Sequence, residues 1–348
     1  FQAEDGIRDA QESRGLGDVY KRQHYGRNIC IINPWRATMR TIYKSTETGL
    51  TVMNEISPGC WINLVDPSTD EIESVTTLGI PADFITYPLD LDERPRIERE
   101  DDGMLLIIFR IPYYEGPKVD IPFTTIPMGI ILTERVIITV CRRSNEVIQE
   151  FTSGKVRGLS TAKRNRFILR LLLLTANRFL SYLREINRMV EVTEDKMQAS
   201  MQNREVLELL KLSKSLVLFN QGLKSNELML ERLQKSQLFH QYPDDEDLLE
   251  DVITENQQAI EMVNISSNIL SSLMDAFASI ISNNLNVVMK FLASVTIVLS
   301  IPTIVTSFFG MNVNLPFADL NHAYLIIIGI FLALCILIVY IFMKRDWF

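Results

Sequence analysis

The chain has 348 residues, of which 47% are hydrophobic and 22% charged, and its formal net charge at pH 7 is −8. An acidic chain lacks the basic surface that nucleic-acid binding requires, which argues against a nucleic-acid partner. The cysteines are scattered and form no CxxC pair, which argues against a disulfide scaffold and a zinc knuckle. They are Cys30, Cys60, Cys141 and Cys335.

The first 38 residues look foreign to the rest of the chain. Residues 1–23, FQAEDGIRDAQESRGLGDVYKRQ, have no apolar period and resemble the in-frame translation of a sequencing-library adapter. Residues 24–38 are interpreted as translated untranslated region, and Met39 as the start of the native protein. A natural disordered tail is the alternative. We therefore look for function only from Met39 onward.

Residues 39–158 are expected to form an α/β or α+β domain. Four runs rich in Ile and Val, at 60–65, 104–111, 128–133 and 135–141, are typical of strands. A helix is expected after the first run, with Asp66 or Ser68 as its N-cap and acidic residues in its first turn. Proline and glycine are expected to mark the gaps between elements, at Pro112, Gly116, Pro117 and Pro122.

From residue 159 onward the sequence pattern predicts long helices. Residues 159–245 carry apolar residues at helical spacing, which predicts a helical hairpin with its turn near Asn203. A stalk helix is predicted over 246–309, because this stretch contains no glycine and only one proline, Pro302. A helix of this length needs partners along it, so we expect an oligomer.

Two apolar runs near the C-terminus are long enough to cross a membrane. Residues 291–309 and 324–343 contain no charged residue, and about 20 apolar residues span the hydrocarbon core of a bilayer. Lys290 precedes the first run, and the tail at 344–348 is basic. Because positive residues stay on the cytoplasmic side, both termini are expected inside and the link at 310–323 outside.

The first apolar run carries a polar stripe at spacings of three and four residues. Small or hydroxyl side chains on one helix face favour close helix packing in membranes. The same stripe, repeated around an axis, can also line a pore with weak oxygen ligands, and it contains no ionisable group. The stripe residues are Asn286, Met289, Ala293, Thr296, Ser300, Thr303 and Ser307.

The link between the two runs begins with Gly-Met-Asn, at Gly310, Met311 and Asn312. Mg²⁺ gives up its water reluctantly, so a filter for the hydrated ion needs neutral oxygen ligands held at the mouth. Gly310 is expected to permit a sharp turn through positive φ. Met311 is expected to brace the turn, and Asn312 to supply a ring of amide oxygens.

With this motif in this position, the chain resembles the CorA family of magnesium channels from about Met39 to its end. The resemblance implies a funnel-shaped homopentamer in a bacterial or archaeal cell membrane, with Mg²⁺ as both the transported and the regulatory ion. It implies a selectivity filter at Gly310, Met311 and Asn312, a pore hydroxyl at Thr303, and a constriction at Met289 and Leu292 above Asn286. Leu292 and Ala293 are adjacent, so which of them faces the axis stays open.

The sequence departs from the family pattern in three places. Phe309 stands where many relatives have Tyr, and Ser300 stands where some have a bulky apolar residue. Asp319 is the only acid in the outer link, which weakens the attraction of cations to the mouth.

An acidic run, DDEDLLED at 244–251, precedes the stalk. The simplest interpretation is a solvated helix start, where acidic side chains also interact favourably with the helix dipole. In the family, a stalk carboxylate and one on the neighbouring α/β domain hold a regulatory Mg²⁺. Asp251 matches the stalk position, and Asp90 and Asp92 are the two candidates for the domain side.

Three other functions compete with a magnesium channel. His240 and His322 have no triad or metal-ligand neighbours, and we expect no enzyme. A CorA-like transporter of zinc, cobalt or nickel is the nearest alternative. A membrane-anchored coiled-coil scaffold is the other, but it leaves the polar stripe and Asn312 without a purpose.

Overall fold

The computed structural model describes residues 39–46, 49–101, 103–154, 156, 158–199, 203–236, 238–239, 242–311 and 323–345. From Arg40 onward the chain forms one unit. The segment 1–38, interpreted from sequence as non-native, lies outside the described residues, and that interpretation stays a prediction.

The α/β part is built on one seven-stranded sheet with the order β2-β1-β3-β7-β6-β5-β4. β3 and β7 are parallel, whereas β1 with β2, β4 with β5, β5 with β6 and β6 with β7 are antiparallel. The strands are β1 (Met39–Thr46), β2 (Gly49–Met53), β3 (Trp61–Val65), β4 (Arg96–Arg99), β5 (Leu105–Tyr114), β6 (Phe123–Leu132) and β7 (Ile137–Cys141).

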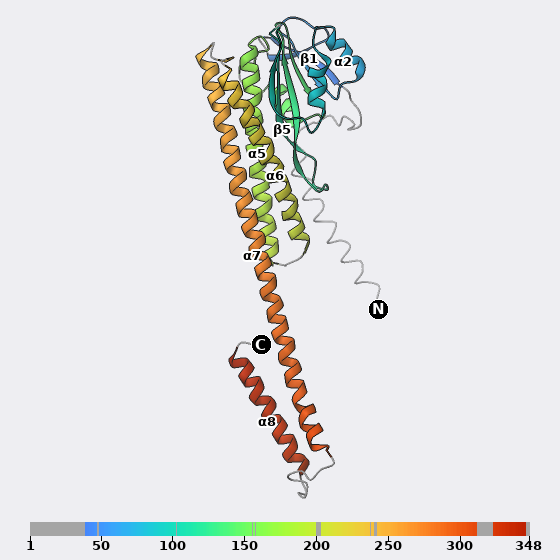
Figure 1. The fold of residues 1–348 in the computed structure, drawn as a ribbon, viewed down its shortest axis with the longest axis vertical. Helices are drawn as coiled ribbons and strands as arrows, with labels where there is room; N and C mark the ends of the chain where they lie inside the picture. The colour runs from blue at the N-terminus through green and yellow to red at the C-terminus, as the bar shows by residue number, and fades with distance from the viewer. Residues whose placement is uncertain are drawn as a thin grey trace, which may run out of the picture. The chain divides into compact units, whose positions relative to one another are not determined.

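Both faces of the sheet are buried. Alternate residues of each strand point to opposite sides and so pack into different cores. Ile107 and Phe109 pack into a core with the long helices. Leu106 and Ile108 pack into a second core with α2 (Thr69–Thr76) and α3 (Ala82–Thr86). α2 and α3 therefore cover one face and the long helices the other (Figure 1).

The long helices are α5 (Arg164–Ala199), α6 (Asn203–Lys235) and α7 (Pro243–Phe309). They contact one another and enclose a third core (Figure 1). α8 (Ala323–Lys344) packs against α7. The remaining short elements are η1 (Tyr87–Leu89) and α4 (Glu146–Thr152).

The cap of α2 resolves an open sequence prediction. Ser68 is the N-cap, and its hydroxyl accepts a hydrogen bond from the Glu71 N–H at 3.3 Å. The Glu71 carboxylate accepts one from the Ser68 N–H at 2.9 Å, which completes a capping box. Asp66 is not the cap; it leaves β3 with a φ of 45°.

The prediction that Pro112 lies in a gap between elements is wrong, because Pro112 lies inside β5. The last pair between β4 and β5 joins Arg96 to Ile108, so β5 has no strand on that side at Pro112. The backbone N–H of Arg110 already points to this open side, and Pro112, two residues further, points the same way. Its missing N–H therefore costs no ladder hydrogen bond.

Pro302 is accommodated within α7 without ending the helix. A proline at this position cannot donate to the carbonyl of Val298, four residues earlier. The thiol of Cys335 on α8 lies 4.0 Å from that carbonyl oxygen and donates a weak hydrogen bond to it. A group on the neighbouring helix thus replaces the lost backbone donor.

Candidate ion pathway and acidic loop

In the part of the chain that the structure describes, two helices are long and apolar enough to cross a membrane: the C-terminal part of α7 and nearly all of α8. Few residues of this part of α7, and none of those described in α8, are buried within the single chain. Apolar helices with so much uncovered surface need lipid or other copies of the chain around them.

The predicted stripe and the contact with α8 lie on different faces of α7. Ser294, Ile301 and Val305 are buried, and Val298 meets Cys335. All stripe residues are exposed, as is Leu292. At 3.6 residues per turn, the mean direction of the stripe lies about 140° around the helix from that of the buried face. The structure therefore does not use the stripe to pack α7 against α8.

Two stripe hydroxyls have their protons engaged by the helix backbone. Thr296 donates to the carbonyl of Leu292 and Ser300 to that of Thr296, each at 2.8 Å. A hydroxyl that donates to the backbone keeps its oxygen lone pairs free as acceptors. Both oxygens can accept hydrogen bonds from water, including the water shell of a cation.

The helix ends at Gly310, but not through the predicted positive φ. Gly310 has φ −86° and ψ 1°, values open to other residues. Its lack of a side chain still matters, because a Cβ there would lie 3.1 Å from the carbonyl oxygen of Thr306. Met311 is exposed in the single chain, and Asn312 lies outside the described residues.

The acidic run at 244–251 divides into two groups. Asp245 is buried and accepts a hydrogen bond from Arg166 on α5 at 2.8 Å, and Asp244 pairs with the same guanidinium at 3.1 Å. These hydrogen bonds raise the pKa of Arg166. Asp251 is exposed and makes no hydrogen bond or ion pair with any described residue. Of these three carboxylates, Asp251 alone has no partner within the described part of the chain.

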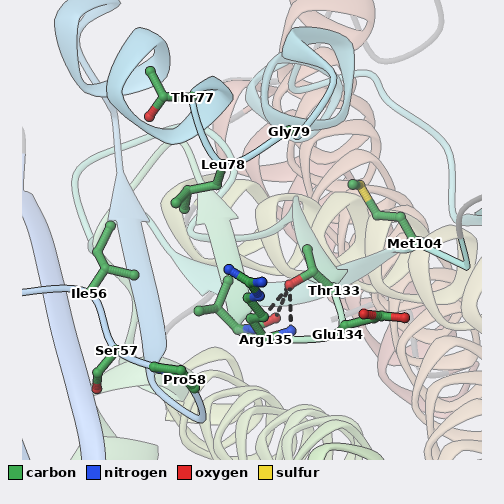
Figure 2. Close-up of a pocket in the computed structure, with 11 residues that line it drawn as sticks. Ile56, Ser57, Pro58, Thr77, Leu78, Gly79, Met104, Thr133, Glu134 and Arg135 are labelled. Carbon is green, nitrogen blue, oxygen red and sulfur yellow. Dashed lines mark hydrogen bonds between the residues drawn. The ribbon is translucent and has the colours of Figure 1, made fainter.

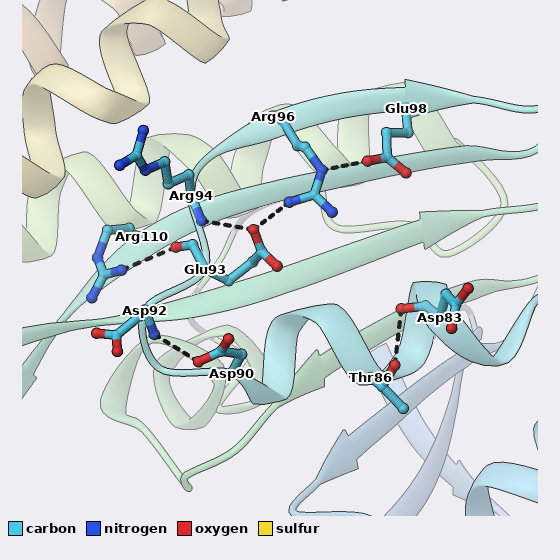
Figure 3. A network of polar contacts seen from close by, with 9 residues as sticks. All are labelled: Asp83, Thr86, Asp90, Asp92, Glu93, Arg94, Arg96, Glu98 and Arg110. Atoms are coloured by element: carbon cyan, nitrogen blue, oxygen red, sulfur yellow. Dashed lines mark hydrogen bonds and ion pairs between the residues drawn. The ribbon is translucent and has the colours of Figure 1, made fainter.

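The domain-side candidates lie in what we call the acidic loop, residues 89–93, which joins η1 to β4. Asp90 and Asp92 are both exposed, and the carboxylate of Asp90 accepts a hydrogen bond from the N–H of Asp92 at 3.1 Å (Figure 3). The guanidinium of Arg110 on β5 binds backbone carbonyls of the loop. Its Nη1 donates to the carbonyl of Glu93 at 3.1 Å (Figure 3). Its Nη2 donates to the carbonyl of Leu91 at 3.2 Å.

Arg110 is a half-buried charge. Burial lowers the pKa of its guanidinium, and the carboxylate of Asp92 partly opposes that change. Its remaining donors reach Thr125, through Nε to Oγ1 at 2.8 Å and through Nη2 to the carbonyl at 2.6 Å. Sequence analysis missed Arg110, although a lone charge inside the apolar strand LLIIFRIPYY was a signal for it.

Among the residues that the structure describes, no three His, Cys, Asp or Glu side chains lie close enough together to hold an ion. Asp251, Asp90 and Asp92 are therefore not brought together with one another as such a cluster. Exposed carboxylates are nevertheless the hard oxygen ligands that Mg²⁺ accepts.

A cavity of about 680 Å³ lies elsewhere, at the turn between β6 and β7 (Figure 2). Arg135 extends from this turn towards Leu78, whereas the carboxylate of Glu134 points to the side of Met104 (Figure 2). None of the residues predicted from sequence as pore, filter or regulatory ligands lines this cavity.

Comparisons with known proteins agree with this architecture. Residues 58–345 match the family described as CorA-like Mg²⁺ transporter protein. A protein of Methanocaldococcus jannaschii named cobalt/magnesium transport protein CorA is 29% identical over 303 residues, which cover 82% of this chain and 90% of that protein.

Two solved structures share the fold. The complete structure of the CorA magnesium transporter from Methanocaldococcus jannaschii matches with a TM-score of 0.78 and 24% identity, over 90% of this chain and 100% of that one. The full-length CmaX protein matches with a TM-score of 0.64 and 16% identity, over 88% of this chain and 97% of that one.

Proposed function

Because the chain belongs to the family of CorA-like Mg²⁺ transporter proteins, a family of divalent-cation transporters, we propose that it is a homopentameric channel for Mg²⁺ influx. The domain organisation that we propose is the α/β domain at 39–158, the helical hairpin at 159–245, the stalk and first membrane helix at 246–309, the outer loop at 310–323, the second membrane helix at 324–343 and the basic tail at 344–348.

The observation that carries the proposal is the free polar stripe on α7. α8 covers one face of α7 and leaves the stripe exposed, so copies of α7 can meet along it around a common axis. The filter residues Gly310, Met311 and Asn312 then stand at the outer end of that axis. A hydrated cation passes between neutral oxygens and keeps its water shell.

The geometry also favours one of the two candidates at the constriction. The direction opposite the α8-facing residues of α7 passes about 30° from Leu292 and about 70° from Ala293. Met289 lies about 30° from it as well. We therefore assign Met289 and Leu292 to the hydrophobic constriction, where a ring of apolar side chains closes the pore by excluding water.

In this proposal both termini lie in the cytoplasm. Val298 of α7 contacts Cys335 of α8. Met289 lies nine residues before Val298, and Lys344 lies nine residues after Cys335. Lys290 and Lys344 therefore mark the same membrane boundary, and basic residues favour the inner side. Influx then follows the membrane potential, worth about 2.3 kcal/mol per charge for each 100 mV.

Intracellular Mg²⁺ closes the channel in this proposal. The ion bridges Asp251 of one protomer and Asp90 or Asp92 of its neighbour, carboxylates that otherwise repel each other. When internal Mg²⁺ falls, the bridges are lost, the interfaces loosen and the constriction fills with water. The availability of Asp251, which has no described partner in its own chain, supports this role.

Co²⁺ is the second ion that we consider, because the relative from Methanocaldococcus jannaschii is named as a cobalt and magnesium transport protein. Ni²⁺ and Zn²⁺ are weaker candidates. The intact Gly-Met-Asn motif favours Mg²⁺ over Zn²⁺, because the zinc-transporting branch commonly carries a variant of it.

The test is ion flux into liposomes. The purified full chain is reconstituted with a trapped magnesium dye, and an inside-negative potential is applied. We expect a dye signal that depends on external Mg²⁺, and its loss in Asn312→Ala. Flux of the variant at the wild-type rate would contradict the filter, and no flux in the wild type would contradict the channel.

A further inference from the structure

We propose that Arg110 and Asn226 are positioning residues for regulation, which fix the acidic loop and couple it to the stalk helix. This inference rests on the proposed closure by Mg²⁺ at Asp251 and the acidic loop, and goes beyond it by naming what holds the loop in place. Neither side chain is itself a metal ligand in this scheme.

The acidic loop is held through alternate carbonyl groups. Arg142 donates to the carbonyl of Leu89 at 3.1 Å, and Arg110 donates to those of Leu91 and Glu93. The intervening residues, Asp90 and Asp92, keep their side chains exposed. With these carbonyls bound by the arginines, the loop keeps the carboxylates of Asp90 and Asp92 on its exposed side. Figure 3 shows both carboxylates beside Arg110.

Asn226 of α6 binds the backbone of Arg110 itself. Its Oδ1 accepts from the N–H of Arg110 and its Nδ2 donates to the carbonyl of Arg110, both at 2.8 Å. The side chain is 5% exposed, and it continues the ladder where β4 has ended. One turn earlier, Gly222 lets α6 approach Thr125, whose methyl carbon would lie 2.9 Å from an added Cβ.

The connection continues from α6 to α7. Asn256 of α7 is buried and donates to the carbonyl of Leu223 on α6 at 3.3 Å. Asn256 lies five residues after Asp251, little more than one helical turn. Hydrogen bonds at both ends of this route, joined through α6 itself, thus link the acidic loop to the part of the same chain's α7 that carries the proposed stalk ligand.

The consequence is a loop that is ordered before the metal arrives. A fixed loop spares the bound state the conformational entropy of ordering it, which raises the affinity of the site. A loop released from Arg110 still bears both carboxylates but binds Mg²⁺ less tightly. The free channel is expected to conduct as before, because the pore is not altered.

The experiment measures the Mg²⁺ concentration that half-protects the full-length protein from chymotrypsin, which does not cleave at the substituted residues. We expect Arg110→Gln to raise this concentration about tenfold. Flux into liposomes without internal Mg²⁺ is expected to stay at the wild-type level. Arg110→Lys keeps the charge but not the forked donors, so we expect a shift in the same direction. Arg110→Lys carries the test should Arg110→Gln not assemble.

Two controls separate positioning from general destabilisation. Arg135→Gln removes an exposed arginine whose guanidinium has no partner among the described residues, and no shift is expected. In the Asp251→Ala background, Arg110→Gln is expected to cause no additional shift, because both substitutions act on one site. A further shift of similar size in that background would overturn the inference.

The outcomes distinguish this inference from the function on which it rests. Absence of Mg²⁺ protection in the wild type would refute the proposed regulation. Normal protection in the wild type, a higher midpoint in Asp251→Ala and a wild-type midpoint in both Arg110 variants would refute the role of Arg110 alone.

Discussion

At the scale of single residues, Gly129 shows how tightly the acidic loop is anchored to the sheet. Gly129 lies in β6 between Ile108 of β5 and Val140 of β7. A Cβ added there would lie 2.2 Å from Cγ of Pro88, the buried proline of η1. The glycine is needed for the close approach of the segment that leads into the acidic loop, not for its backbone angles.

We expect Gly129→Ala to lower stability by about 1–3 kcal/mol, because the proline ring or the strand must shift. Gly222→Ala is the matched control. Its nearest neighbour is a side-chain methyl group of Thr125, which can move more easily than a ring held in the backbone, so a smaller loss is expected. Thermal unfolding of both variants measures the difference, and equal melting temperatures would contradict the explanation.

Some features could be predicted from the sequence and others could not, and the reasons are physical. The charge-free runs are visible in the sequence because a bilayer demands about 20 apolar residues. The first part of β6, from Phe123 to Pro127, was missed because a proline and two threonines hide the strand. Pro127 lies just beyond the end of β7, so its missing N–H is tolerated there as at Pro112. The partners of Arg110 come from segments distant in sequence, and no local pattern predicts them.

At the scale of the element, α7 is one helix with two differently used faces in its membrane part. The face with Ile301 and Val305 is covered, and the face with Ser300 and Thr303 is exposed. A packing role and a pore role for the stripe make different predictions about water on that exposed face after assembly.

We expect cysteines at positions 300 and 303 to react with a small charged thiol reagent in the assembled protein, whereas cysteines at 301 and 305 do not. The substitutions are made in a chain whose native cysteines are replaced, and labelling is followed by mass spectrometry. Water in the pore supports the reaction on the stripe, because only the thiolate reacts. Protection of Ser300→Cys and Thr303→Cys in the open state would favour packing.

At the scale of the whole molecule, the proposed closure depends on carboxylates from different protomers. We expect Mg²⁺ to protect the wild-type protein from proteolysis, and EDTA to remove the protection. Asp251→Ala is expected to need a higher Mg²⁺ concentration, because one ligand of each bridge is lost. Asp244→Ala removes a carboxylate of the same run that is already paired with Arg166 within the chain, and serves as the control. Unchanged protection in Asp251→Ala would contradict the proposed site.

The continuity of α7 has a mechanical consequence. Its 67 residues correspond to a rod of about 100 Å, uninterrupted from the acidic run to the turn at Gly310. If such a rod tilts by about 3° about one end, the other end moves by about 5 Å, nearly a helical turn. A rearrangement too small to disturb the packing of the α/β domain is thus amplified along the rod into a displacement large enough to change the width of an opening.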